Sequence, residues 1–277
     1  MKNYAYVTYL GTNDYLIGTL ALINELKSVE SKYPIYVLVS SNLNEESIKL
    51  IKQNGAKVLE TSEVEIPVEI KKRNEKLGYS RWNFTFEKLQ VFNLDQFDKI
   101  IMLDSDMLVK RNIDKLFEKP SLSAVCAGDK YPKNIDWKGL NSGIVVIKPN
   151  KKEFLRLVEL IDVDTPGDQD VIQKGNPDWN DDNELHLDES YNVISSFEAY
   201  YVGILKYKNI KIIHFTHRIK PWKMTRIYRI KYVCSIIFRQ LRDCRTLRGV
   251  NNAVSDFLHY CQICDKLKAS INEKDVF

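Results

Sequence analysis

The chain has 277 residues, of which 44% are hydrophobic and 28% charged, and its formal net charge is +4. This composition predicts a folded globular protein and excludes a disordered chain. The positive excess gathers after Lys220 and lacks the broad basic face and recognisable motif of nucleic-acid-binding proteins, so we expect no nucleic-acid partner.

Cysteine usage and the N-terminus predict the compartment. The five cysteines are an odd number without framework spacing, which predicts free thiols in a reducing environment. One Cys-x-x-Cys, Cys261 and Cys264, is too little to predict zinc. The first residues show no apolar signal core, and no stretch has the length of a membrane span. These features predict a cytoplasmic protein.

Strand and helix alternate from the beginning of the chain. Strands are predicted at residues 4–10 and 35–39, where β-branched and aromatic residues run together. Asp14 is predicted to cap the first helix and Asn44 to open the second. This alternation indicates βαβ units and a largely parallel sheet.

The middle of the chain interrupts this pattern. Residues 60–83 are polar and without a clear period, which predicts a loop, and a helix is predicted at 84–94. Further strands are predicted at 100–103, 124–127, 143–147 and 210–214, and further helices at 151–161 and after Asp168.

The C-terminal part has a different residue pattern. From about Thr225, isoleucines recur at helical spacing among arginines and lysines, which predicts a basic amphipathic helix followed by one or two more helices. We therefore divide the chain into an α/β domain, 1–224, and a helical extension, 225–277. The basic helix is expected to pack its apolar side on the domain. Peripheral contact with an anionic membrane is the alternative, and the extension could also serve a homodimer.

Two carboxylates, Asp104 and Asp106, follow an apolar predicted strand directly. Ligands of open α/β sheets collect beyond the carboxyl ends of the strands. Successive side chains of an extended chain point to opposite sides, so Asp104 and Asp106 would point the same way. They could then share one hard cation that bridges two phosphates. The alternative is a turn or cap ahead of Asn112.

Several further motifs occur in a fixed order: residues 12–14 (Thr-Asn-Asp), 86–89 (Phe-Glu-Lys-Leu), 104–106, 141–143 (Asn-Ser-Gly), 168–170 (Asp-Gln-Asp) and 214–222. Over about residues 7–222 this order resembles that of the glycogenin-like retaining glycosyltransferases, glycosyltransferase family 8. The resemblance implies a GT-A fold, an α/β Rossmann-like domain with a mixed sheet flanked by helices. It also implies transfer of a hexose from a UDP-sugar, UDP-glucose first and UDP-galactose second, to a hydroxyl acceptor with retention of configuration.

The resemblance further implies a Mn²⁺ ion, with Mg²⁺ as the alternative, bound by Asp104, Asp106 and His214. An imidazole with two carboxylates suits Mn²⁺ better than Ca²⁺, because imidazole is the softer ligand. His217 remains a competing ligand. Lys220 would stabilise negative charge on the departing diphosphate.

Other residues are expected around the donor. By the same resemblance, Lys88 would lie near its phosphates or hydroxyls, and Asp168 and Gln169 would face its reacting carbon. Either would act as nucleophile in a double displacement or stabilise an oxocarbenium-like centre in a front-face reaction. The residues expected to bind the nucleotide or the donor sugar are Leu10, Thr12, Asn13, Ser105, Asn141, Ser142 and Gly143.

The acceptor is left open: a glycan, a lipid-linked sugar, a protein or a polyol. One alternative function is a non-catalytic protein that binds nucleotide-sugars or glycans on the same scaffold. A nucleotidyltransferase is another, since that chemistry also uses paired aspartates. Such an enzyme would be expected to carry a glycine-rich phosphate loop, whereas residues 10–13 contain one glycine, Gly11.

Overall fold

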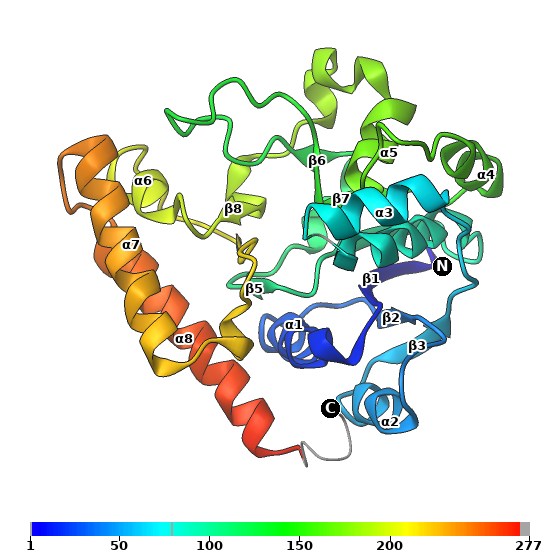
Figure 1. Cartoon of the computed structure of the whole chain (residues 1–277), viewed down its shortest axis with the longest axis horizontal. Coiled ribbons are helices and arrows are strands. Elements are labelled where there is room, and N and C mark those ends of the chain that lie inside the picture. Colours follow the sequence, from blue (N-terminus) through cyan, green and yellow to red (C-terminus); the bar gives the residue numbers. More distant parts are fainter. Residues whose placement is uncertain (1, 79, 272–277) are drawn as a thin grey trace.

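The computed structural model describes residues 2–78 and 80–271, which form two sheets surrounded by helices (Figure 1). The larger sheet has six strands in the order β3-β2-β1-β4-β7-β6. Its strands are β1 (Tyr4–Leu10), β2 (Ile35–Val39), β3 (Lys57–Glu60), β4 (Lys99–Leu103), β6 (Ala124–Val125) and β7 (Asn141–Ile147). β1, β2, β3 and β4 pair in parallel, whereas β7 pairs antiparallel with both of its neighbours, β4 and β6. The sheet is therefore mixed.

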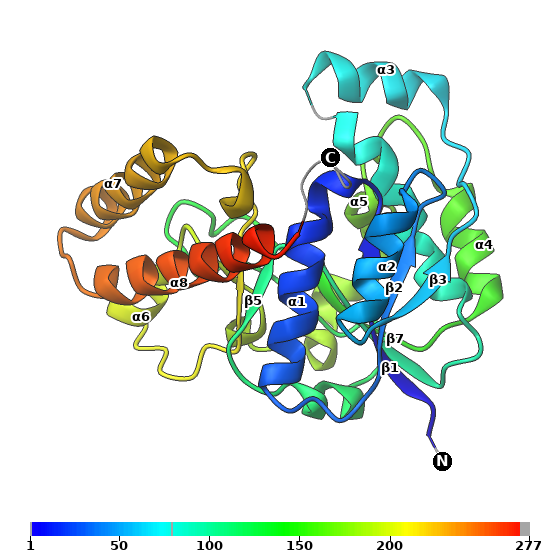
Figure 2. The same cartoon turned by 90° about the horizontal axis from the view of Figure 1, so that it is seen from below.

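Helices cover both faces of this sheet (Figure 2). α1 (Leu16–Ser28) and α2 (Glu45–Gln53) lie on one face, and a 3₁₀ helix η2 (Ser80–Asn93), α4 (Lys151–Glu159) and α5 (Asp168–Gly175) lie on the other. Side chains of β1 alternate between the two cores: Tyr6 and Leu10 join the first, Ala5 and Val7 the second. α3 (Val68–Lys76) packs on η2.

A smaller sheet extends the carboxyl end of the larger one. It contains β5 (Met107–Val109), β9 (Ile212–His214) and β8 (Val193–Ile194), in the order β5-β9-β8. The remaining short helices are η1 (Asn13–Tyr15), η3 (Asp114–Glu118), η4 (Pro177–Asp181), η5 (Asn183–Leu185), η6 (Glu189–Tyr191), α6 (Glu198–Gly203) and η7 (Pro221–Lys223). Of this sheet, only β9 was predicted, within the strand expected at 210–214. β5 and β8 were missed, because strands of two or three residues leave no periodic signal.

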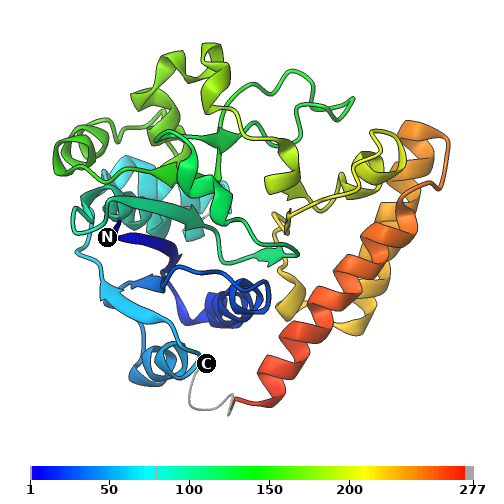
Figure 3. The same ribbon diagram turned by 180° about the vertical axis from the view of Figure 1, so that it is seen from behind.

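The last two helices, α7 (Arg226–Cys244) and α8 (Val250–Ala269), form an antiparallel pair, and α8 lies between α1 and α7 (Figure 2, Figure 3). They share one core cluster with Ile17 of α1 and Leu108 of β5. A Cβ atom on Gly203 would lie 2.1 Å from the carbonyl oxygen of Arg248, so glycine is needed where α6 meets the beginning of α8. The division of the chain at residue 224 stays a prediction.

Among the described residues, no helix combines the length and the apolar character needed to cross a membrane. All five cysteines are free thiols, as predicted.

Most predicted elements are confirmed, including the strands at 4–10 and 35–39 and the second helix, whose N-cap Asn44 accepts a hydrogen bond from Ser47 N at 2.9 Å. The prediction that Asp14 caps the first helix is wrong. The chain first makes the 3₁₀ turn η1, so Tyr15 takes the N-cap position, and Asp14 instead pairs with Lys223 at 2.7 Å.

Two further predictions need correction. Residues 60–83 contain the helix α3, which was missed because it buries only Ile70 and Asn74 and so shows little apolar period. The helix expected at 84–94 runs as a 3₁₀ helix from 80 to 93. In this geometry side chains three apart share one face, and Phe86, Leu89 and Phe92 are all buried there.

Candidate active site

Residues 104–106 connect the two sheets, since β4 ends just before them and β5 begins just after. The Asp104 N–H donates to the carbonyl of Gly143 in β7 at 2.8 Å, and the Phe215 N–H donates to the carbonyl of Asp106 at 2.9 Å. Each aspartate is thus fixed by a different sheet. The junction holds both carboxylates beyond the carboxyl end of β4.

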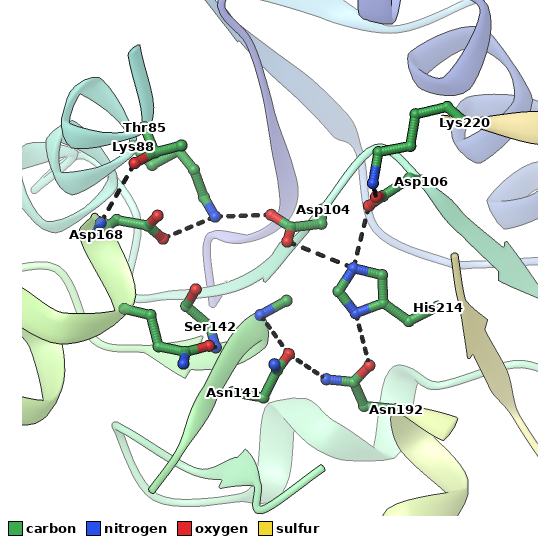
Figure 4. Close-up of polar contacts among 12 residues, drawn as sticks. Thr85, Lys88, Asp104, Asp106, Asn141, Ser142, Asp168, Asn192, His214 and Lys220 are labelled. Atoms are coloured by element: carbon green, nitrogen blue, oxygen red, sulfur yellow. Dashed lines mark hydrogen bonds and ion pairs between the residues drawn. The ribbon is translucent and has the colours of Figure 1, made fainter. Parts of the chain in front are cut away.

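His214, the last residue of β9, completes this group (Figure 4). Its Nε2 atom lies 3.1 Å from Asp106 Oδ1 and 3.7 Å from Asp104 Oδ2. One ligand atom from each residue lies within 4.8 Å of the others, and within 2–78 and 80–271 no other group of metal-binding side chains meets that criterion. Two oxygens and one imidazole nitrogen form a donor set that fits a divalent transition metal.

A hydrogen-bond chain fixes the tautomer of His214. The Gly143 N–H can only donate, and it donates to Asn141 Oδ1 at 3.0 Å. The Asn192 amide donates to the same oxygen at 2.7 Å and therefore presents its own carbonyl oxygen to His214 Nδ1 at 3.0 Å. Nδ1 then carries the proton, and the Nε2 lone pair is directed at the aspartates. This is how a second residue orients a metal-binding histidine.

Gly143 has a steric role beside this chain. A Cβ atom at this position would lie 2.6 Å from His214 Cε1 and 2.8 Å from Asn141 Oδ1. The absence of a side chain therefore makes room for the imidazole ring against β7.

Lys220 binds the second aspartate. Its ammonium group donates to Asp106 Oδ2 at 2.5 Å and to the carbonyl of Phe215 at 3.0 Å, and all of its polar partners are deeply buried. Burial alone would raise the pKa of Asp106, but the buried ammonium group of Lys220 is the largest opposing cause, and the pKa is held well below its ordinary value. The carboxylate is therefore ionised at neutral pH.

Lys88 joins the first aspartate to helix α5. Its Nζ atom lies 2.7 Å from Asp104 Oδ1 and 2.8 Å from Asp168 Oδ2. Burial would lower the pKa of Lys88, but the two carboxylates raise it above its ordinary value. The Asp168 N–H also donates to Thr85 Oγ1 at 3.3 Å, so η2 and α5 are held together at the site.

Gln169 links α5 to β7. Its Oε1 atom accepts a hydrogen bond from Ser142 N at 3.1 Å, and this leaves the amide NH₂ of Gln169 as the group that can donate to a ligand. Figure 4 shows Asp168 approaching the aspartates from the side opposite Lys220.

These residues border a cavity of about 760 Å³, a size suited to a small-molecule ligand. The predicted site residues that line it are Thr12, Lys88, Asp104, Ser105, Asp106, Ser142, Asp168, Gln169, His214 and Lys220. Four others do not line it: Leu10, Asn13, Asn141 and Gly143. The amide oxygen of Asn13 accepts from Ser47 Oγ at 2.8 Å and so ties η1 to α2. Its role in binding a nucleotide stays a prediction.

His217, the competing ligand, does not belong to the group formed by Asp104, Asp106 and His214. Its ring packs edge-on against Tyr232 of α7, with the ring centroids 4.6 Å apart. Burial, together with the positive charges of Arg239 and Lys220, lowers the pKa of His217 to about 4. His214 is therefore the histidine that the fold places with the carboxylates.

Several residues that line the cavity or support the site were not predicted. Tyr9 donates to Glu87 Oε2 at 3.0 Å, and Phe84 and Trp137 expose more than a third of their surface beside the cavity. Large exposed aromatic side chains in polar segments were the available hint for the last two. Asn192 had none, since its importance depends on His214, which is 22 residues away in the sequence.

The family model for Glycosyl transferase family 8 matches residues 6–226. The chain belongs to this family. It is 31% identical over 228 residues to glycogenin-1 of Caenorhabditis elegans, covering 79% of this chain and 50% of that protein. It is 28% identical to galactinol synthase 1 of Solanum lycopersicum, covering 80% of this chain and 74% of that protein.

Solved structures show the same fold at low sequence identity. The apo glycosyltransferase GlyE of Streptococcus pneumoniae TIGR4 has a TM-score of 0.55 at 17% identity, covering 94% of this chain and 64% of that one. The galactosyltransferase LgtC, solved with donor and acceptor sugar analogs, has a TM-score of 0.53 at 14% identity, covering 93% and 95%. The predicted GT-A fold and the family 8 resemblance are confirmed.

Proposed function

We propose that this family 8 protein transfers a hexose from a UDP-sugar to a hydroxyl acceptor with retention of configuration. UDP-glucose is the first donor expected and UDP-galactose the second. Membership of the family supports glycosyl transfer, and the relatives named glycogenin and galactinol synthase support a sugar donor. The choice of donor, the acceptor and the metal are the parts that experiment must establish.

The observation that carries the proposal is the tautomer-fixed His214 beside two carboxylates at the edge of a cavity. Asp104, Asp106 and His214 would hold Mn²⁺, with Mg²⁺ as the alternative. When bound, the ion would neutralise the diphosphate and stabilise it as a leaving group. The imidazole argues against Ca²⁺, which prefers oxygen ligands.

Lys220 and Lys88 supply the other positive charges. Lys220 now binds Asp106, and a donor diphosphate would compete for the same ammonium group as negative charge develops on it. Lys88, fixed between Asp104 and Asp168, would present its charge to the donor phosphates or sugar hydroxyls. Both lysines are buried, so the surrounding low dielectric strengthens these interactions.

Asp168 and Gln169 would lie beside the donor sugar. Gln169 keeps an amide NH₂ for a sugar hydroxyl, whereas the Asp168 carboxylate is engaged by Lys88. A carboxylate that is neutralised by a lysine is a weaker nucleophile, which favours Asp168 as an electrostatic and positioning group. Ser142, also at the cavity, would donate its hydroxyl to the same sugar.

The test is release of UDP from a panel of UDP-sugars with and without Mn²⁺. Wild type is compared with Asp106→Asn, which keeps the size of the side chain and removes its charge. A matched control is Asp178→Asn, an exposed carboxylate in η4 outside the cavity. We expect metal-dependent UDP release from one donor, lost in the first variant and kept in the control.

Other results would assign another function. Pyrophosphate release instead of UDP would indicate a nucleotidyltransferase. Metal-dependent UDP binding without turnover of any donor, even with a panel of glycan and polyol acceptors, would indicate a binding protein. No metal-dependent UDP binding at all would refute the site.

A further inference from the structure

Helix α7 is apolar on two opposite faces. Its inner face contributes Tyr232 and Ile236 to the core cluster shared with α8. The helix also exposes a second set of large apolar side chains, each between 45% and 65% exposed: Ile227, Tyr228, Ile230, Phe238 and Leu241. At 3.6 residues per turn, Ile227, Ile230, Phe238 and Leu241 form one stripe along the helix. We call this stripe the outer face of α7.

The exposed charges beside the outer face are all positive. They belong to Arg226, Lys231 and Arg242 of α7, and to Arg245 and Arg248 just beyond it. The helix contains one carboxylate, Asp243, whose side chain is 2% exposed and binds Lys133 and Arg242 at 2.6 Å each. The surface that α7 presents to solvent is therefore apolar and cationic, without an exposed carboxylate.

An exposed apolar stripe of this length marks an interaction site rather than ordinary surface. From the sequence, we expected α7 to pack its apolar side on the domain. The inner face does so, whereas the side chains of the outer face remain uncovered by the described part of the chain. A symmetric contact between two copies would bring Arg226, Lys231 and Arg242 against one another, because the same patch faces itself across a two-fold axis.

We propose that the outer face of α7 binds an anionic lipid surface. Its apolar side chains would enter the boundary between headgroups and acyl chains, while the flanking arginines and lysine contact the acidic headgroups.

Both ends of α7 are connected to the cavity. Lys220 and Lys223, which line the cavity, lead directly into the beginning of the helix. At the other end, Asp243 is bound by Tyr131 and Lys133, from the segment that also carries the cavity-lining Trp137. A membrane-bound α7 would hold the cavity close to the bilayer, where lipid-linked acceptors lie. That consequence rests on the proposed function, whereas lipid binding itself does not.

The experiment is co-sedimentation with vesicles of phosphatidylcholine alone, or mixed with an equal part of phosphatidylglycerol. We expect wild type to bind the mixed vesicles and to be released by high salt. Phe238→Glu with Leu241→Glu should lower the partition coefficient at least about tenfold, because two apolar side chains that would enter the bilayer are lost. Both positions are exposed, so the fold is not at risk.

Two further variants separate the contributions. Arg226→Gln with Lys231→Gln should weaken binding to the anionic vesicles by about fivefold for each charge removed. Leu155→Glu with Val68→Glu adds the same two negative charges at exposed apolar positions on α4 and α3, and should bind like wild type.

The proposal is overturned if wild type binds neither kind of vesicle, binds both equally, or binds no better than the Phe238→Glu and Leu241→Glu variant. It is also overturned if sedimentation velocity shows a dimer that this variant dissociates, since the outer face would then be a protein interface. None of these measurements requires sugar transfer. Absence of lipid binding would therefore leave the proposed function unaffected, and absence of UDP release would leave lipid binding unaffected.

Discussion

Replacing Asn192 by leucine should weaken metal binding without touching a metal ligand. The side chain is fully buried, and leucine has the same branched shape and the same number of side-chain heavy atoms. The change removes the acceptor for His214 Nδ1–H, so the ring loses the contact that directs its Nε2 lone pair toward Asp104 and Asp106.

The magnitude follows from two independent considerations. Loss of the second residue that orients a metal ligand lowers metal affinity by about 10–100-fold, which corresponds to roughly 1.4–2.8 kcal/mol. A buried donor left without a partner costs about 1–3 kcal/mol, a range that agrees. We therefore expect the Kd for Mn²⁺ to rise by one to two orders of magnitude.

The assay is calorimetric titration of Mn²⁺ in the presence of UDP, with thermal unfolding measured in chelator. Gln240→Leu is the matched control, because it also removes a buried side-chain amide, here one that donates to the carbonyls of Ala199 and Arg248 and lies outside the site. Both variants should lose thermal stability, and only Asn192→Leu should lose metal affinity. Unchanged Mn²⁺ affinity in Asn192→Leu, or an equal loss in the control, would refute the reasoning.

Three other perturbations test the same structure. Gly143→Ala should displace the ring of His214, lower Mn²⁺ affinity and cost about 1–3 kcal/mol of folding stability, and a variant with unaltered affinity would contradict the steric argument. Lys220→Met should lower kcat for UDP release by about 10²–10³ with a smaller change in Mn²⁺ affinity, and a kcat within a few-fold of wild type would remove Lys220 from the mechanism. Burial, with Asp129 nearby, raises the pKa of Glu189 to about 8 from 4.5. Since the folded chain then holds a proton that the unfolded chain has released, stability should fall as pH rises between these values. Glu189→Gln should flatten that slope and gain up to a few kcal/mol relative to wild type at alkaline pH, as checked by urea unfolding across the range, and parallel pH profiles would disprove it.

Local sequence patterns were enough to predict the elements and residues whose structure is determined by their neighbours along the chain. The apolar run of β4 followed by Asp104 and Asp106 could be read directly, because a buried strand that ends in two charges places them at the carboxyl edge of a sheet. The Asn44 cap and the amphipathic helix after Thr225 are equally local, since their signals lie within one or two turns. The order of the family motifs then supplied His214 as the third ligand.

Tertiary structure decided which of these side chains meet and how they are oriented. His214 reaches Asp106 across 108 residues of chain through the pairing of the predicted strand β9 with β5, a strand too short to predict. Asn192 acquires its role only when the fold brings it against His214 and Asn141, and α7 shows two apolar faces only once α8 covers one of them. Sequence periodicity reports the burial of a residue relative to its neighbours along the chain, whereas hydrogen-bond direction and the partner of an apolar face depend on segments that meet only on folding.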